Sequence, residues 1–230
     1  MRLLPVGDDS LLVDLDSPEE AQALHAELLR RRGAGTLAPI AEIVPGDRTI
    51  LLRSISGVDT LRTELGRWHV PALTADSGPL LEIPVVYNGT DLRDVAALWG
   101  VTEDEVVRRH SGVEHRVAFC GFAPGFAYMT GLDEAYHVPR RSAPRTSVPA
   151  GSVALAGAYT GIYPRPSPGG WQLIGTTDVP LWDMEREPAA LLTPGTRVRF
   201  VPRDPAPAPA PAPAPASGQS AGVTTERMRT

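Results

Sequence analysis

Residues 121–177 hold the side chains of this chain that are best suited to bind a small anion. The stretch contains 9 Gly, 7 Pro and 7 of the 13 aromatic residues of the chain. Disordered segments lack aromatic residues to bury, so the pattern indicates a folded, loop-rich surface. Four residues of the stretch are Arg and only two are acidic, although the formal net charge of the whole chain is -5. This local excess of positive charge predicts a binding site for an anionic small molecule.

Three arginines of this stretch are the first candidates for contacts with the anion. The planar guanidinium group binds carboxylates and phosphates in a forked geometry, which favours Arg140, Arg141 and Arg145. Pro144 and Pro149 bracket Arg145 in a constrained loop, and we assign that arginine a catalytic role. Its replacement by Ala is expected to reduce activity strongly while the isolated chain stays folded. The alternative is that these arginines pair with acidic residues at the surface.

Glycines, hydroxyl groups and aromatic rings of the same stretch are candidates for further contacts. Glycine lets backbone N–H groups approach a phosphate or oxyanion, hydroxyl groups can donate hydrogen bonds, and aromatic side chains can line a ligand ring. The predicted substrate-binding residues of these kinds are Gly125, Gly151, Gly169, Gly170, Ser152, Thr160, Ser167, Phe126, Tyr128, Tyr163 and Trp171. The alternatives are tight turns of a β-barrel for the glycines and ordinary core packing for the other side chains.

His110 is the second candidate catalytic residue. It falls in the last turn of a predicted helix, where the helix dipole stabilises a protonated imidazole, and histidine commonly acts as a general base or proton shuttle. A purely structural role is the alternative. The five histidines show no metal-ligand spacing with carboxylates, so we expect no metal to be held by this chain.

The composition excludes several kinds of chemistry. All 22 basic residues are Arg, and a lysine is needed for a Walker-type phosphate loop, a Schiff-base nucleophile or a biotin attachment site. A reaction that uses ATP or biotin therefore requires a partner subunit, unless Arg and backbone N–H groups bind the phosphates. The single Cys120 excludes an internal disulfide framework, and a pI near 5.6 argues against nucleic-acid binding. The sequence shows neither a membrane span nor a signal pattern, so we expect a cytoplasmic protein.

The pattern of elements predicts an α+β protein. Residues 1–77 show the order strand, helix, two strands, helix, which is typical of a split βαβ, ferredoxin-like domain; the predicted elements are 11–15, a helix from Pro18 to Gly33, 40–44, 49–55 and 58–68. Residues 78–203 begin with a strand and two helices and continue with short strands between Gly/Pro loops. Several strands with long loops favour a closed or nearly closed barrel. Residues 204–230 are predicted to be a disordered tail, because Pro and Ala alternate from Pro205 to Ala216.

The sequence resembles the KipI/PxpB family, also called allophanate hydrolase subunit 1, over nearly the whole chain up to Pro202. The four blocks that carry the resemblance are GFAPGFAY at 121–128; PRR at 139–141 with PR at 144–145; VPAGSV at 148–153; and TGIYP at 160–164 leading into SPGGW at 167–171. Four blocks in one order are more specific than one short motif. Two places depart from the family pattern, at 175–177 and at Glu114-His115.

The resemblance implies a ferredoxin-like domain followed by a cyclophilin-like β-barrel domain. It also implies the B subunit of an ATP-dependent 5-oxoprolinase, which cleaves 5-oxo-L-proline to L-glutamate. The implied partners are a C-type subunit, similar to biotin-dependent carboxyltransferases, and an A-type LamB/YcsF subunit. ATP, with Mg²⁺, is the implied cofactor, shared with a partner. Two alternatives stay open: an inhibitor of a sensor histidine kinase, and a subunit of an allophanate hydrolase or urea carboxylase system.

Overall fold

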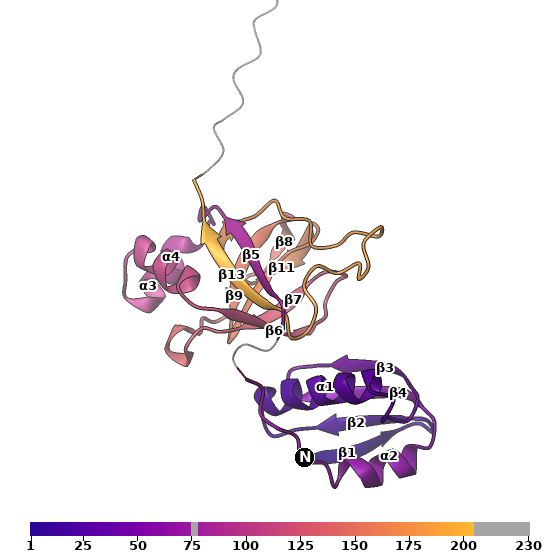
Figure 1. Ribbon diagram of the computed structural model, residues 1–230. Coiled ribbons are helices and arrows are strands. Elements are labelled where there is room, and N and C mark those ends of the chain that lie inside the picture. Colours follow the sequence, from indigo (N-terminus) through magenta and orange to yellow (C-terminus); the bar gives the residue numbers. More distant parts are fainter. Residues whose placement is uncertain (75–77, 205–230) are drawn as a thin grey trace, which may run out of the picture.

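The protein has a smaller N-terminal part and a larger β-rich part, shown in Figure 1. The computed structural model describes residues 1–74 and 78–204. Residues 1–74 and 78–204 each contain their own cluster of buried apolar side chains. The predicted Pro/Ala tail lies, apart from Asp204, outside the described residues. The division into domains at 77 and 203 stays a prediction.

The N-terminal part contains a four-stranded antiparallel sheet and two helices. The strand order is β1-β2-β4-β3, so β2 and β3 run parallel with β4 between them. The elements are β1 (Arg2–Val6), β2 (Ser10–Asp14), α1 (Pro18–Gly33), β3 (Ile40–Pro45), β4 (Thr49–Ile55) and α2 (Val58–Leu65). Strand β1 was not predicted from the sequence, because it is a largely exposed edge strand that lacks alternation of buried and exposed residues.

Local capping interactions explain where α1 begins. The hydroxyl of Ser17 accepts a hydrogen bond from the N–H of Glu20 at 3.2 Å, and Pro18 occupies the first turn. The carboxylate of Glu20 accepts from the N–H of Asp16 at 3.2 Å, one residue before the usual partner in a capping box. The apolar face of α1 packs with that of α2 against the sheet, because Leu24, Leu28 and Leu61 belong to one buried cluster.

The larger part contains a seven-stranded sheet that nearly closes into a barrel, which confirms the predicted architecture at this level. The strand order is β12-β9-β10-β7-β6-β13-β5. Val86, just after β5, pairs with Thr176 of β12 through hydrogen bonds of 2.9 and 2.8 Å, which brings the two edges together. The strands are β5 (Leu80–Val85), β6 (His115–Cys120), β7 (Ala127–Thr130), β9 (Ser152–Ala156), β10 (Tyr159–Ile162), β12 (Gln172–Thr176) and β13 (Arg197–Pro202).

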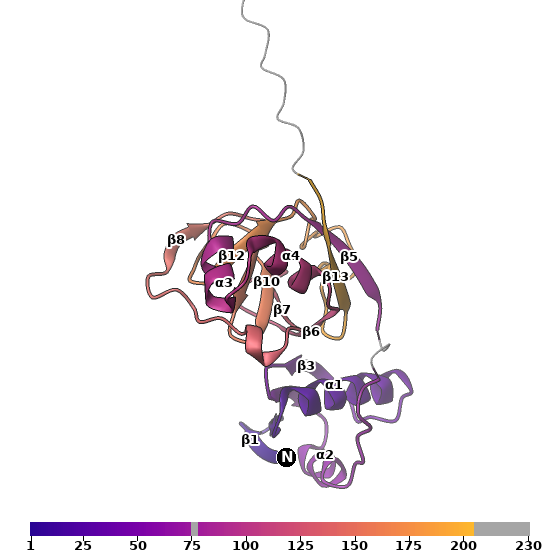
Figure 2. The same ribbon diagram turned by 90° about the vertical axis from the view of Figure 1, so that its left-hand side faces the viewer.

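Short elements outside this sheet shape its loops. The two-stranded antiparallel sheet of β8 (Arg145–Val148) and β11 (Ser167–Gly169) was not predicted from the sequence. The 3₁₀ turn η1 (Glu134–Tyr136) and strand β7 were not predicted either. The helices α3 (Leu92–Trp99) and α4 (Glu103–Ser111) lie together at one side of the barrel in Figure 1, and this side faces the viewer in Figure 2. None of the helices within 1–74 and 78–204 is long and apolar enough to cross a membrane.

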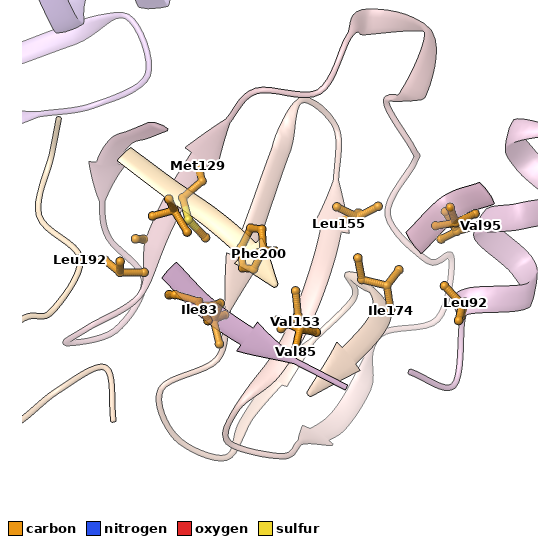
Figure 3. Packing of buried hydrophobic residues seen from close by; sticks show 14 of the residues in the cluster. Ile83, Val85, Leu92, Val95, Met129, Val153, Leu155, Ile174, Leu192 and Phe200 are labelled. Atoms are coloured by element: carbon orange, nitrogen blue, oxygen red, sulfur yellow. The ribbon is translucent and has the colours of Figure 1, made fainter. Parts of the chain in front are cut away.

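Apolar side chains fill the interior of the barrel. Figure 3 shows Phe200 of β13, Val153 of β9 and Ile174 of β12 pointing toward one another, with Leu92 and Val95 of α3 at one side. All five side chains are buried. The barrel is therefore a packed core rather than a ligand channel, and a binding site has to lie on its outer surface or among its loops.

Candidate functional site

A cavity of about 300 Å³ lies among the loops that leave the barrel. Its walls come from the β6–β7 loop, β7, the segment before β8, the β10–β11 loop, β11 and the turn before β12. The lining residues are Phe122, Phe126, Tyr128, Arg140, Pro144, Tyr163, Pro168, Gly169, Gly170 and Trp171. Seven of these residues belong to the predicted site, so the structure brings together about half of that set; Phe122, Pro144 and Pro168 were not in it.

A cluster of perpendicular aromatic rings forms one wall of the cavity. The ring of Phe126 lies 5.4 Å from that of Trp171 at 89° and 5.4 Å from that of Tyr163 at 81°. Tyr128 completes the group, 5.1 Å from Phe126. Edge-to-face pairs of this kind stabilise the arrangement beyond simple burial. Phe126 and Trp171 are buried at 1% and 6% exposure, so these rings act both as core and as cavity wall.

A tight loop exposes Phe122 at the rim of the cavity. The N–H of Ala123 donates to the carbonyl of Gly121 at 2.7 Å, and Phe122 between them has a φ of 65°, which non-glycine residues rarely adopt. The side chain is 60% exposed, and its ring lies 5.3 Å from that of Phe126. Phe122 was not among the predicted site residues, although its place between Gly121 and Gly125 of the 121–128 motif is a usable signal. Gly125, at a φ of 82°, supports the loop but does not line the cavity.

Arg141 and Arg145 are held by a buried carboxylate. The Oδ1 atom of Asp91 accepts a hydrogen bond from Arg141 at 2.6 Å and from Arg145 at 2.7 Å. Arg145 also donates to the hydroxyl of Thr90 at 3.2 Å and to the carbonyl of Trp171 at 3.5 Å. Pairing with an acid, the alternative considered for these arginines, is therefore observed, but the acid is buried and not at the surface. Neither arginine lines the cavity.

Arg140 is the arginine of this segment that borders the cavity. Its side chain is exposed, and within the described part of the chain no hydrogen bond or ion pair engages it. Burial raises the pKa of Tyr128 and of Tyr163, and the positive charge of Arg140 acts in the opposite direction on both. The cavity thus combines a cation that is available to a ligand with protonated phenol groups and apolar rings.

Several predicted donors are already used within the protein. The hydroxyl of Ser152 donates to the carbonyl of Pro149 at 2.8 Å, and the hydroxyl of Ser167 donates to the carbonyl of Arg165 at 3.1 Å. The N–H of Gly151 donates to the carbonyl of Tyr163 at 2.7 Å. These three groups stabilise loop turns, and none of them lines the cavity.

His110 lies in the barrel interior, away from the cavity. Its Nδ1 atom is 2.7 Å from the hydroxyl of Tyr87, and its Nε2 atom is 3.3 Å from the hydroxyl of Thr160. Complete burial and the charge of His115 lower the pKa of His110 well below its ordinary value. The expectation that the helix end favours a protonated imidazole is wrong, because desolvation outweighs the helix dipole. Its proposed catalytic role stays a prediction.

Two larger cavities, of about 760 and 680 Å³, lie where residues of the N-terminal part meet the barrel. Their walls mix acidic and basic side chains, among them Glu19, Arg109 and Glu114. None of the predicted site residues lines either of them. Across 1–74 and 78–204, no group of three or more His, Cys, Asp or Glu side chains could hold a metal ion.

Comparison with known proteins identifies relatives along most of the chain. The family described as "Carboxyltransferase domain, subdomain C and D" matches residues 1–192. The B subunit of 5-oxoprolinase from Escherichia coli is 38% identical over 205 residues, which cover 86% of this chain and 94% of that protein. The protein of the same name from Haemophilus influenzae is 37% identical and is covered to 97%. A urea amidolyase from Lachancea kluyveri matches 25% of this chain and only 3% of its own length.

The fold has close counterparts among solved structures. The protein TTHA0988 superposes with a TM-score of 0.71 and 34% sequence identity over 91% of this chain. This chain spans 44% of the length of that protein. The arrangement of a small α/β part and a nearly closed barrel therefore also occurs within a longer chain.

Proposed function

We propose that this chain, which belongs to the family of the carboxyltransferase domain, subdomain C and D, is the B subunit of a cytoplasmic, ATP-dependent 5-oxoprolinase. The enzyme opens the lactam ring of 5-oxo-L-proline to give L-glutamate. The support from the comparisons is that two relatives named as 5-oxoprolinase B subunits match this chain along nearly their whole length. The urea amidolyase match is partial, so it gives little support to a urea-type or allophanate-type function.

The observation that carries the proposal is the cavity that contains Arg140. 5-Oxoproline is a small five-membered ring with one carboxylate, and a cavity of about 300 Å³ can contain it. Arg140 pairs with the carboxylate, because its guanidinium has no competing partner in the described residues. The rings of Trp171 and Tyr128 pack against the lactam ring, and the phenol of Tyr128 stays protonated because burial raises its pKa. These residues bind and orient the substrate.

We place most of the ATP site, with its Mg²⁺, on a partner subunit. ATP activates the lactam carbonyl by phosphoryl transfer, and the chain lacks the lysine of a Walker-type loop. Arg141 and Arg145 are engaged by Asp91, and a cavity of about 300 Å³ does not fit ATP together with 5-oxoproline. The partners we propose are the C-type subunit, similar to biotin-dependent carboxyltransferases, and the A-type LamB/YcsF subunit.

We also propose the finer fold assignments. In a ferredoxin-like domain, the strand that follows the second helix in the chain occupies one edge of the sheet. Here β1, at the N-terminus, occupies that edge, and the order of the other three strands is that of a ferredoxin-like domain. The nearly closed barrel with helices α3 and α4 at its side supports a cyclophilin-like domain. Prolyl isomerase activity does not follow from such a likeness, since a fold supports many functions.

Co-expression of this chain with its C-type and A-type partners tests the function. The purified complex should form glutamate from 5-oxoproline and consume ATP. In that complex Arg140→Gln should raise the KM for 5-oxoproline about tenfold, as expected for loss of one charge-assisted hydrogen bond. Arg165→Gln is the matched control, because Arg165 is an exposed arginine of the same stretch outside this cavity.

Absence of glutamate from the complete complex would refute the proposal. Turnover of urea-derived substrates would favour the urea-type alternative. If the chain co-purified with a sensor kinase and with no carboxyltransferase-like subunit, the alternative function as a kinase inhibitor would be favoured.

A further inference from the structure

We propose that Asp91 is a positioning residue that sets where Arg140 stands at the cavity. The inference rests on the proposed function, since it assigns Arg140 to the substrate carboxylate. Asp91 does not line the cavity, and it acts through the segment that carries Arg140. Arg141 and Arg145 then anchor that segment, and Arg140 is the arginine of the three that binds the ligand.

Asp91 is a buried acceptor for three donors from two distant segments. Its side chain is 3% exposed. Oδ1 accepts from Arg141 and Arg145, and Oδ2 accepts from the backbone N–H of Leu173 at 2.7 Å. One carboxylate at the start of α3 therefore connects the segment before β8 with the start of β12.

Further bonds tie the same segment to the turn before β12. The N–H of Arg141 donates to the carbonyl of Gly170 at 2.7 Å, and the side-chain amide of Gln172 donates to the carbonyl of Pro139 at 3.2 Å. Arg140 lies between these two attachment points. Its backbone cannot shift far while both neighbours are held, and its side chain reaches the cavity.

The charge balance makes Asp91 the essential member of this network. Arg141 and Arg145 approach the same oxygen atom, so removal of the carboxylate charge leaves two partly buried cations that repel each other. The Nε atom of Arg141 is buried and has no hydrogen-bond partner in the described residues. At that atom, the described residues therefore offer no second acceptor that could take the place of Asp91. Asp94, 3.6 Å from Arg141, is 65% exposed and shielded by solvent. Loss of the Asp91 charge should release the segment and displace Arg140.

Asp91→Asn, compared with Asp94→Asn, tests the proposal in the co-expressed complex. Both changes remove one carboxylate near Arg141 at the start of α3. Asp91→Asn should raise the KM for 5-oxoproline at least tenfold and change kcat less than twofold, and Asp94→Asn should alter neither by more than twofold. A merely structural role would lower the amount of active enzyme without changing KM, and that result would overturn the proposal.

A double-mutant cycle with Arg140→Gln tests whether Asp91 acts through Arg140. In the Arg140→Gln background, Asp91→Asn should raise KM by less than twofold. Independent, multiplicative effects on KM would overturn the proposal. Asp91→Glu keeps the charge and should recover at least part of the wild-type KM.

Amide hydrogen exchange of the isolated chain tests the anchoring role of Asp91 without measuring enzyme activity. The amide of Leu173 and the amide of Arg141 should exchange at least tenfold faster in Asp91→Asn than in Asp94→Asn. Equal protection in the two variants would refute the anchoring role of Asp91. If the wild-type complex forms no glutamate while this difference in exchange is found, the proposed function fails and the anchoring stands.

Discussion

Buried histidines should make the barrel sensitive to mild acid, and His115 allows this effect to be measured. His115, on β6, is fully buried; its Nε2–H donates to the carbonyl of His110 at 3.0 Å, and its Nδ1 has no partner in the described residues. Burial lowers the pKa of His115 from 6.5 to about 4, against a smaller opposite effect of the bond to His110. The folded protein therefore keeps this imidazole neutral at a pH where the unfolded chain protonates it.

The direction and size of the effect follow from proton linkage. Because the folded-state pKa is lowered, the contribution to stability is complete above pH 6.5 and is lost as the pH falls toward 4. For this shift, the loss in free energy of unfolding between pH 7 and pH 5 is about 2 kcal/mol. Burial also lowers the pKa values of His110 and His25, so both residues add to the loss of stability in the wild type and in every variant that keeps them.

Comparison of His115→Gln with the wild type isolates the contribution of His115. Glutamine can keep the hydrogen bond to the His110 carbonyl but cannot take up a proton. Urea unfolding at pH 7 and pH 5, followed by tryptophan fluorescence, should show that the variant loses about 2 kcal/mol less than the wild type. His137→Gln, which removes an exposed imidazole, should behave like the wild type. Equal losses in His115→Gln and the wild type would refute the argument from burial.

Two further predictions concern the aromatic wall and the rim of the cavity. Gly161→Ala should lower the free energy of unfolding by about 1–3 kcal/mol, because a Cβ there would lie 2.9 Å from both Phe126 and Trp171; an unchanged melting temperature would show that the rings can move aside. Phe122→Ala should change stability by less than about 0.5 kcal/mol, because its side chain is 60% exposed, yet raise the KM for 5-oxoproline in the complex at least threefold. An unchanged KM would remove Phe122 from the site.

Features that depend on neighbouring residues were predictable from the sequence. Ser17 and Thr102 cap helices as expected, since each hydroxyl accepts from the N–H three residues later. Gly100 ends α3 in a left-handed conformation. Strand β4 was predicted with its correct bounds because the turn residues Pro45-Gly46-Asp47 precede an apolar run in which Ile50 and Leu52 are buried. Helix α1 ends at Gly33 as predicted, whereas α2 ends at Leu65 rather than at Trp68.

Strands that depend on distant partners were not predictable in the same way. β7 lies inside a Gly/Pro-rich stretch and forms because β6 and β10 pair with its two sides. β8 and β11 are short and pair with each other although β9 and β10 lie between them in the sequence. Composition indicates a loop at these places, and only the pairing of remote segments turns them into strands.

The sequence by itself determined that residues 121–177 form a folded, positively charged surface, because aromatic rings need burial and arginines outnumber acidic residues there. It could not show which of the three arginines of the 140–145 segment are already paired with an acid, and Arg145, singled out there for catalysis, is one of the paired ones. Tertiary structure decided that question, because Asp91, which reads in the sequence as the start of a helix, lies 50 and 54 residues from Arg141 and Arg145 and binds both. Which cation meets a ligand depends on which cations are already neutralised by a buried charge, and this becomes visible only when distant segments fold together.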